Sequence, residues 1–226
     1  MKTQKKLWSA LAALCVATGT VAQPAYNYSK LQKEQLGRGV VAIRENPLDV
    51  VVSWRYLSSD PINTSFNVYR NGEKIAEVPH STGTFYRDTY SGNEKAVYTV
   101  KPVINGVETG KLNGNYTLPA NAPSGYIDIP LDRPAEGVTP SGQKYTYSPN
   151  DASIGDVDGD GEYEIILKWD PSNAHDNAHD GYTGNVYFDC YRLTGEKLWR
   201  IDLGHNVRAG AHYTLSLIHI SEPTRP

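Results

Sequence analysis

Residues 156–171 read DVDGDGEYEIILKWDP, an acidic loop with two glycines that leads directly into a strand-forming segment. The run EIILKW combines β-branched, aliphatic and aromatic residues and contains neither glycine nor proline, which is typical of a β-strand. The chain therefore enters a strand, not a helix, as soon as it leaves the loop. This stretch favours a β-fold over a helix–loop–helix arrangement.

Five carboxylates within nine residues repel one another unless a cation lies among them. Asp156, Asp158, Asp160 and Gly161 have the spacing of positions 1, 3, 5 and 6 of an EF-hand calcium loop, whereas position 12 is Leu167 instead of glutamate. We therefore predict a compact Ca²⁺ site with ligands from Asp156, Asp158, Asp160, Glu162 and Glu164. The alternative is a solvated acidic turn, because Asp and Gly favour turns for local reasons. A structural role for the ion is favoured over contact with a substrate, because an ion held by protein oxygens leaves little room for one.

The segment 27–118 contains short strand-like runs separated by turn residues, with Asn-Gly hairpin signals at Asn71-Gly72 and Asn105-Gly106. Trp54 on an early run and Tyr98 on a later one resemble the core tryptophan and tyrosine of fibronectin type III domains. We expect a fibronectin type III-like β-sandwich here. The whole chain is predicted to be all-β.

A second organisation begins after Leu118, where the linker PANAPSG interrupts the strand pattern. The run YRLTGEKLWRIDLG has the form of a propeller hairpin with its turn at Thr194-Gly195. We interpret residues 119–214 as the start of a β-propeller that is incomplete, because the segment supplies too few strands to close a ring.

The N-terminus has the pattern of a secretory signal peptide: basic MKTQKK, a short apolar run, and small residues before QPA. We predict that residues 1–22 are removed by cleavage after Ala22, and that the protein is secreted or periplasmic, without a membrane span. Cys190 is then the sole cysteine, so no internal disulfide is expected, and a small buried side chain is the favoured interpretation. The net charge of −3 with interspersed signs argues against a nucleic-acid partner.

Several blocks of the chain, from about Leu36 to Thr214, resemble the N-terminal part of bacterial rhamnogalacturonan lyases. They include GRGVVAIRENPLDVVVSWRYLSSD, PSGYIDIPLDRP, YSPNDASIGDVDGDGEYEIILKWDPSNAHDNAHDGYTGNVYFDCYRL and GEKLWRIDLGHNVRAGAHYT. The resemblance implies a calcium-rich, eight-bladed propeller enzyme that cleaves the rhamnose–galacturonic acid backbone of pectin by β-elimination. It implies pectic polysaccharide as the partner, and we expect a monomer.

The resemblance also places substrate contacts in the segments SPND and KWDPSN, which flank the acidic loop and its strand. It implies that Asn150 and Asp170 contact sugar, and Lys168 has the charge to pair with a uronate. The alternatives are turn formation for Asn150 and Asp170 and, for Lys168, a partly buried side chain whose ammonium reaches solvent. The catalytic residues are unknown, and the resemblance implies that most lie beyond Thr214.

The motif HDNAHD places His175 and His179 four residues apart, as in zinc proteases. The run is rich in Asn, Asp and Gly and lacks the helix and glutamate that this zinc motif needs. A loop that offers Asp176 or Asp180 to a further calcium ion is the favoured interpretation. For Arg208, a salt bridge at a strand end is favoured over binding of a uronate.

The last twelve residues, LSLIHISEPTRP, depart from the family pattern, and we interpret residues 215–226 as a translated sequencing adapter. The chain is then a fragment that we expect to be inactive by itself. Two other functions stay open: a non-catalytic, calcium-dependent carbohydrate-binding or adhesion module, and another exported hydrolase acting on pectin. A hydrolase would need a pair of carboxylates at a defined separation, and this sequence does not identify such a pair.

Overall fold

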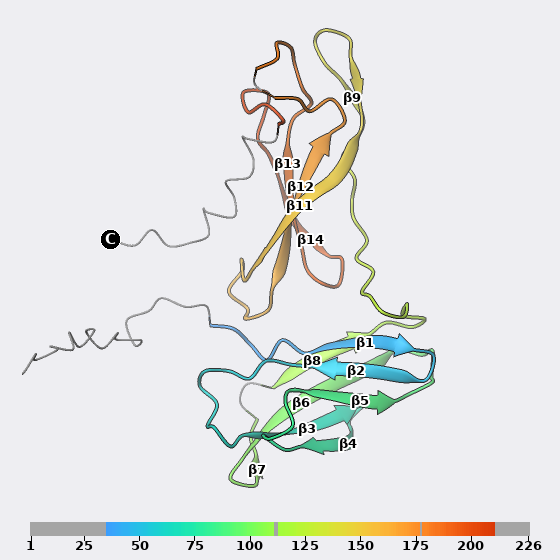
Figure 1. Ribbon diagram of the computed structural model, residues 1–226, viewed down its shortest axis with the longest axis vertical. Coiled ribbons are helices and arrows are strands. Elements are labelled where there is room, and N and C mark those ends of the chain that lie inside the picture. Colours follow the sequence, from blue (N-terminus) through green and yellow to red (C-terminus); the bar gives the residue numbers. More distant parts are fainter. Residues whose placement is uncertain (1–34, 111–112, 177, 211–226) are drawn as a thin grey trace, which may run out of the picture. The chain divides into compact units, whose positions relative to one another are not determined.

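The computed structural model describes residues 35–110, 113–176 and 178–210, and this part of the chain contains strands but no helix (Figure 1). The all-β prediction is therefore confirmed for the described residues. None of their elements is a helix long and apolar enough to span a membrane. The predicted signal peptide with its cleavage site, and the tail after Thr214, lie outside the described residues.

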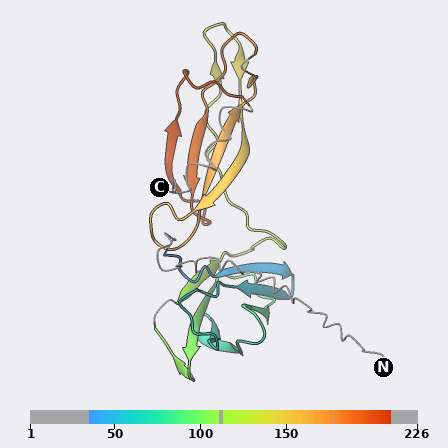
Figure 2. The same cartoon turned by 60° about the vertical axis from the view of Figure 1, so that its left-hand side comes forward.

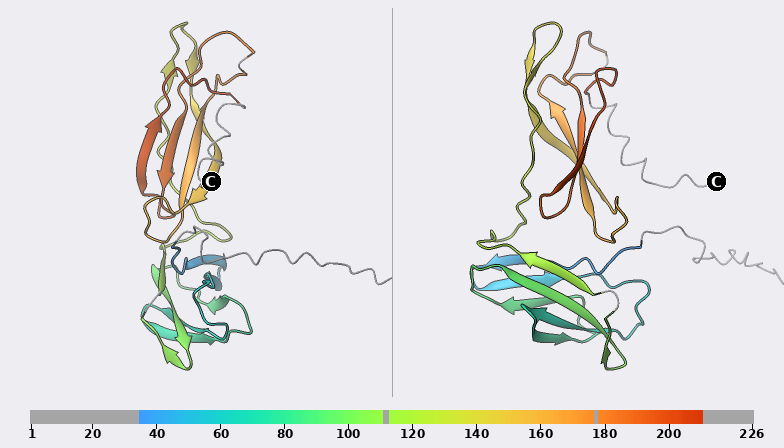
Figure 3. Two further views of the ribbon diagram at one scale, coloured as in Figure 1. Left: turned by 90° about the vertical axis from the view of Figure 1, so that its left-hand side faces the viewer. Right: turned by 180° about the vertical axis from the view of Figure 1, so that it is seen from behind.

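Two antiparallel sheets form the region up to Leu118 (Figure 3). The first sheet has the strand order β1-β2-β5 and consists of Val41–Asn46, Asp49–Ser53 and Phe85–Thr89. The second has the order β4-β3-β6-β7, with β8 also paired to β6. Its strands are β3 (Ser65–Arg70), β4 (Glu73–Val78), β6 (Ala96–Ile104), β7 (Val107–Glu108) and β8 (Gly114–Leu118).

One hydrophobic core joins these two sheets. Val50 and Val52 from the first sheet pack in the same cluster as Val68 and Val100 from the second, and all four are fully buried. Trp54 belongs to this core and meets Phe66 edge to face, with ring centroids 5.4 Å apart. The alternation of buried and more exposed residues along β1 and β2 is the period-2 pattern of strands with one face on a core.

Both Asn-Gly hairpins are confirmed. Asn71 and Gly72 connect β3 to β4 with φ angles of 51° and 86°, and Asn105 and Gly106 connect β6 to β7 with 52° and 78°. Two successive left-handed residues are what a type I′ turn requires, and Asn and Gly adopt that region at the lowest cost.

The linker after β8 returns to the first sheet before the chain continues. The backbone N–H of Gly125 donates a hydrogen bond of 2.7 Å to the carbonyl of Arg44, and Ser124 forms an isolated parallel bridge with the same residue. Residues 126–136 then contain no strand. A small antiparallel pair follows, β9 (Gly137–Val138) with β10 (Lys144–Tyr145).

The remaining strands form a four-stranded meander in chain order, β11-β12-β13-β14 (Figure 2). They are β11 (Tyr147–Gly155), β12 (Glu164–Pro171), β13 (Tyr187–Tyr191) and β14 (Lys197–Asp202). The predicted hairpin around Thr194-Gly195 is confirmed, since β13 and β14 pair antiparallel across it. Leu167 and Trp169 of β12 pack in one hydrophobic cluster with Tyr147 and Tyr191.

A buried carboxylate, Asp189, fixes three strands of this meander to one another. It is fully buried, and it accepts hydrogen bonds from the indole N–H of Trp169 and the hydroxyl of Tyr191, both at 2.7 Å. The guanidinium of Arg200 on β14 donates two further bonds of 2.6 Å. Although burial alone would raise the pKa of Asp189, these donors hold it below its ordinary value. The donors and the charge of Arg200 offset the cost of burying this carboxylate.

Candidate functional site

The three residues predicted to contact substrate lie together because of strand register. On β12, Lys168 and Asp170 project to the same face, since side chains alternate along a strand. Asp170 pairs with Ser148 of β11, and the register between the strands shifts between Pro149 and Ala152. This irregularity contains Asn150 and turns its side chain toward Asp170. β-Bulges commonly re-aim side chains in this way beside active sites.

Hydrogen bonding and charge connect this group. The amide Nδ2 of Asn150 donates to Oδ2 of Asp170 at 3.1 Å, and the ammonium of Lys168 lies 3.3 Å from Oδ1 of the same carboxylate. Lys168 is 4% exposed, so its charge is balanced mainly by Asp170. The expected alternative for Lys168, an ammonium that reaches solvent, therefore does not describe this side chain.

A cavity of about 370 Å³ lies over this group. Asn150, Lys168 and Asp170 line it, and its other lining residues are Asp151, Ala174, His175, Asp176 and Gly210. Oδ1 of Asp170 and Nε2 of His175 are buried and have no hydrogen-bond partner within the part of the chain that the structure describes. Buried polar atoms without partners are costly and are common where a ligand supplies the missing bond.

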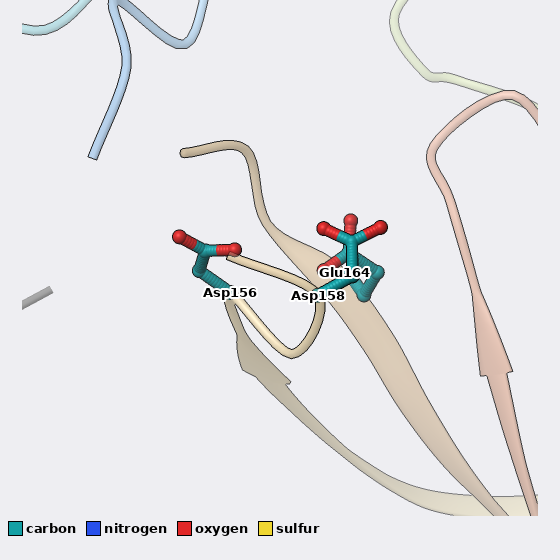
Figure 4. A group of neighbouring side chains, drawn as sticks. All are labelled: Asp156, Asp158 and Glu164. Carbon is teal, nitrogen blue, oxygen red and sulfur yellow. The ribbon is translucent and has the colours of Figure 1, made fainter. Parts of the chain in front are cut away.

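The acidic loop brings together three of its five predicted ligands. Carboxylate oxygens of Asp156, Asp158 and Glu164 lie within 4.8 Å of one another (Figure 4). Backbone N–H groups of the loop donate to all three: Gly159 to Asp156 at 2.8 Å, Asp160 to Asp158 at 3.2 Å, and Val157 to Glu164 at 3.0 Å. The N–H of Gly161 also donates to Asp156, at 3.1 Å, so the loop is folded around its own carboxylates, which lie close to one another.

The other two predicted ligands face different partners. Asp160 contacts the guanidinium of Arg192 at 2.6 Å. Glu162 accepts a hydrogen bond of 3.2 Å from the backbone N–H of Gly39, and its other oxygen lies 3.8 Å from Arg55. The structure therefore does not place Asp160 and Glu162 in the three-residue cluster.

Arg192 was not predicted from the sequence, and it is the cation nearest to the cluster among the described residues. It lies 2.5 Å from Asp158, 2.6 Å from Asp160 and 3.8 Å from Glu164. Its position follows from register: Ile165 pairs with Tyr191 across β12 and β13, so the residues just outside this pair, Glu164 and Arg192, are neighbours.

The pKa values in the loop follow from burial and charge. Burial raises the pKa of Glu164, which is 1% exposed, and the neighbouring carboxylates of Asp158 and Asp160 raise it further. The hydrogen bond from Arg192 lowers the pKa of Asp160. A buried carboxylate crowded by like charges is a group that a divalent cation would stabilise in its ionised form.

The histidine motif does not have the geometry of a zinc protease site. His175 and His179 lie in an irregular segment, not on a helix, and Nδ1 of His175 lies 2.9 Å from the carbonyl of Asn173. Among the described residues, the one cluster of three or more potential metal ligands contains neither Asp176 nor Asp180. A further calcium at these two residues therefore stays a prediction without a ligand cluster around it.

Arg208 does not form the expected salt bridge with any of the described residues. The guanidinium of Arg208 donates instead to the backbone carbonyls of His179 and Gly181, and no ion pair with an acid is found within the described residues. The acceptors are main-chain oxygens of an irregular segment, which a sequence pattern does not identify. Cys190 is fully buried, as predicted, and burial raises the pKa of its thiol to about 11.

Comparison with known proteins gives two family matches. Residues 126–222 match the model described as rhamnogalacturonan lyase family 11, C-terminal domain. Residues 31–116 match the model of the rhamnogalacturonan I lyases beta-sheet domain. The first match runs past Thr214 into the segment that we interpreted as adapter-derived, and the origin of that segment stays a prediction.

Curated relatives and solved structures agree with these models. Rhamnogalacturonan endolyase YesW of Bacillus subtilis (strain 168) is 45% identical over 223 residues, which cover 97% of this chain and 34% of that protein. Rhamnogalacturonan exolyase YesX of the same organism is 48% identical over 190 residues, 84% of this chain and 30% of that protein. The crystal structure of YesW matches with a TM-score of 0.70 and 51% identity over 80% of this chain and 30% of that one.

The chain is thus similar to polysaccharide lyases over most of its length. More specifically, it matches models of two rhamnogalacturonan lyase domains, over residues 126–222 and 31–116. It spans about a third of the length of the curated relatives that it matches.

Proposed function

We propose that this chain is part of a rhamnogalacturonan lyase, which cleaves the rhamnose–galacturonic acid backbone of pectin by β-elimination. The observation that carries the proposal is the identity of 45% and 48% to two proteins named as rhamnogalacturonan lyases, over most of this chain. One of them is named an endolyase and the other an exolyase, so the proposal concerns the elimination chemistry that both names share.

The chemistry requires a base and a positive group. β-Elimination removes the proton at C5 of a uronic acid, beside a carboxylate whose charge makes the resulting enolate unfavourable. A metal ion or cationic side chain that binds the carboxylate offsets this charge. We propose that the base lies outside this chain and that the chain by itself is inactive.

The contribution of this chain would be substrate binding at the cavity over β11 and β12. Asn150 and Asp170 offer an amide and a carboxylate to sugar hydroxyls, and the buried Oδ1 of Asp170 has an unused acceptor position. Lys168 balances the charge of Asp170 and lines the same cavity, where a uronate could approach its ammonium. Lys168 is buried, Asp170 half-buried and Asn150 exposed, so the cavity offers polar groups that a sugar can reach.

We also propose that calcium binds the acidic loop in a structural role. Two ligands on opposite sides of a Ca²⁺ ion are roughly 4.6–5.2 Å apart, because each Ca–O distance is about 2.3–2.6 Å. The oxygens of Asp156, Asp158 and Glu164, all within 4.8 Å of one another, fit that requirement. The ion would neutralise the buried carboxylate of Glu164 and tie the start of β12 to the loop before it.

For the architecture, we propose a fibronectin type III-like sandwich at residues 27–118, followed at residues 119–214 by the first part of a propeller. The two sheets with one shared core support the first assignment. The four-stranded meander β11–β14, in which each strand pairs with the next, supports the second, because propeller blades have this form. We further propose export through a signal peptide cleaved after Ala22, and action as a monomer.

The reaction type can be tested on the protein completed to the length of its relatives. Elimination leaves a double bond between C4 and C5 conjugated with the carboxylate, so the products of rhamnogalacturonan cleavage should absorb in the near ultraviolet. New reducing ends without this absorbance would indicate a hydrolase instead. Binding of the polysaccharide with no new ends would indicate a carbohydrate-binding module.

A further inference from the structure

Arg192 occupies the position of a counter-cation at the acidic loop. Its guanidinium bridges Asp158 at 2.5 Å and Asp160 at 2.6 Å, and its Nε lies 3.3 Å from Glu196 in its own turn. Glu164, the buried member of the cluster, lies 3.8 Å away. The side chain of Arg192, from the β13–β14 turn, therefore lies within 3.8 Å of three acids from the acidic loop and the start of β12.

The backbone holds Arg192 in this place. Its N–H donates to the carbonyl of Glu196 at 2.9 Å, and its carbonyl accepts from Gly195 at 2.9 Å. Gly195 has a φ of 87°, which allows the tight turn that directs the chain back into β14. The pairing of Ile165 with Tyr191 then sets Arg192 beside Glu164. Register thus places Arg192 beside Glu164, and Asp158 and Asp160 contact it from the acidic loop.

Arg192 and a bound calcium ion would compete for the carboxylate of Asp158. Its Oδ1 accepts the N–H of Asp160, and its Oδ2 contacts Arg192. Asp158 is also one of the three acids whose oxygens converge within 4.8 Å. A calcium ion that used Oδ2 of Asp158 would have to displace the guanidinium from it, and the two cations would repel each other.

We propose that Arg192 is a built-in competitor for calcium: it closes the loop when calcium is absent, releases Asp158 when calcium binds, and so weakens the calcium affinity of the loop. This inference rests on the proposed calcium site but not on the lyase reaction. Arg192 would contribute no ligand to the ion. It would replace part of the ion's charge in the calcium-free protein and keep Asp158 and Asp160 from repelling each other.

The magnitude follows from Coulomb's law. A positive unit charge about 6 Å from a bound divalent cation, at the dielectric constant of water, lowers the affinity of the site for that cation roughly tenfold. Replacing Arg192 by Gln removes that charge and leaves Asp158 available. We therefore expect about tenfold tighter calcium binding in R192Q than in the wild-type chain. The conservative variant R192K keeps the charge but loses the two-pronged contact, so its affinity should lie between the two.

The test measures calcium binding by titration calorimetry, and melting temperature with calcium and with chelator, on this chain. In chelator, R192Q should melt below the wild type; with calcium, the difference should shrink. R87Q is the matched control, since Arg87 forms an exposed ion pair with Glu45 between β5 and β1 and contacts none of the loop acids. It should leave calcium affinity unchanged.

Weaker or equal calcium binding in R192Q would overturn the proposal, because Arg192 would then support the ligands or be irrelevant to them. If R192Q does not fold in chelator, R192K still decides: tighter binding than the wild type supports competition, and weaker or equal binding refutes it. A wild-type chain that binds no calcium would refute both the calcium site and the competition, and would leave the lyase assignment untouched.

Discussion

Asn150 donates a hydrogen bond of 3.1 Å to Asp170, twenty residues further along the chain. The bond crosses the irregular part of the β11–β12 pairing and joins two residues that line one cavity. It holds the carboxylate of Asp170 by Oδ2 and leaves Oδ1 to Lys168 and to the cavity. In the proposed lyase, Asn150 would thus both contact the sugar and orient the carboxylate beside it.

Replacing Asn150 by Ala should lower kcat/KM of the completed enzyme on rhamnogalacturonan. The variant loses one hydrogen-bond donor to a charged group, worth about 1.5–3 kcal/mol, which corresponds to roughly a tenfold to hundredfold fall in kcat/KM. The measurement is the initial rate on rhamnogalacturonan for the completed enzyme. The control is Asn63→Ala, in an exposed turn away from the cavity. Equal rates in the two variants would remove Asn150 from the site.

Replacing Asp158 by Ala should imitate the removal of calcium. The cluster would keep two of its three converging carboxylates, too few for a tight site, so the rise in melting temperature on adding calcium should be lost. Melting curves of this chain with calcium and with chelator give the answer. Glu136→Ala, which removes an equal charge from an exposed position, should respond to calcium as the wild type does. A wild-type calcium response in Asp158→Ala would mean that the loop is not the calcium site.

Glu108 should make the protein sensitive to acid. Hydrogen bonds from Asn67, Tyr69 and Lys101 hold the pKa of Glu108 at about 2, below its ordinary value near 4.5. Because the folded pKa is lowered, the stabilisation is complete above pH 4.5 and is lost as the pH falls toward 2. Glu108→Gln should therefore melt below the wild type at pH 6, and the gap should narrow between pH 4.5 and pH 2. A gap that stays constant over this range would show that the charge of Glu108 contributes nothing.

The segment between the two sheet regions should be the first to be cut by a protease. Tyr126 is 59% exposed and begins a stretch without strands, whereas Ser124 and Gly125 are held against Arg44. Brief digestion with chymotrypsin should therefore cleave after Tyr126 and leave a piece that contains β1–β8 and still melts cooperatively. Mass spectrometry identifies the cut. Early cleavage within residues 41–118 would count against an independent sandwich.

Local signals in the sequence predicted the all-β class and the hairpins. The Asn-Gly turns at Asn71 and Asn105 depend on two residues each, and the structure has both hairpins with the expected left-handed angles. Lys168 and Asp170 could be assigned to one face of a strand by alternation alone. The grouping of Asn150 with them was implied by resemblance, and the structure adds its cause, the irregularity in β11.

Arg192 could not be predicted in the same way. Its contact with Asp158 depends on which residue of β13 pairs with Ile165, and a shift of one position would turn its side chain to the opposite face. Register between strands is set by the packing of whole faces, which a short motif does not encode. The same reason explains Glu162, which the acidic spacing assigned to the loop but which contacts Gly39, more than a hundred residues earlier.

The meander β11–β14 has a consequence for synthesis on the ribosome. Each of its strands pairs with the one that was translated just before it, and the longest connection, between β12 and β13, spans residues 172–186. β3, in contrast, pairs with β6, and β2 with β5, so those sheets need segments that emerge much later. The meander can thus form one strand at a time as the chain leaves the ribosome. Glu164 and Arg192 come together once β13 has paired with β12.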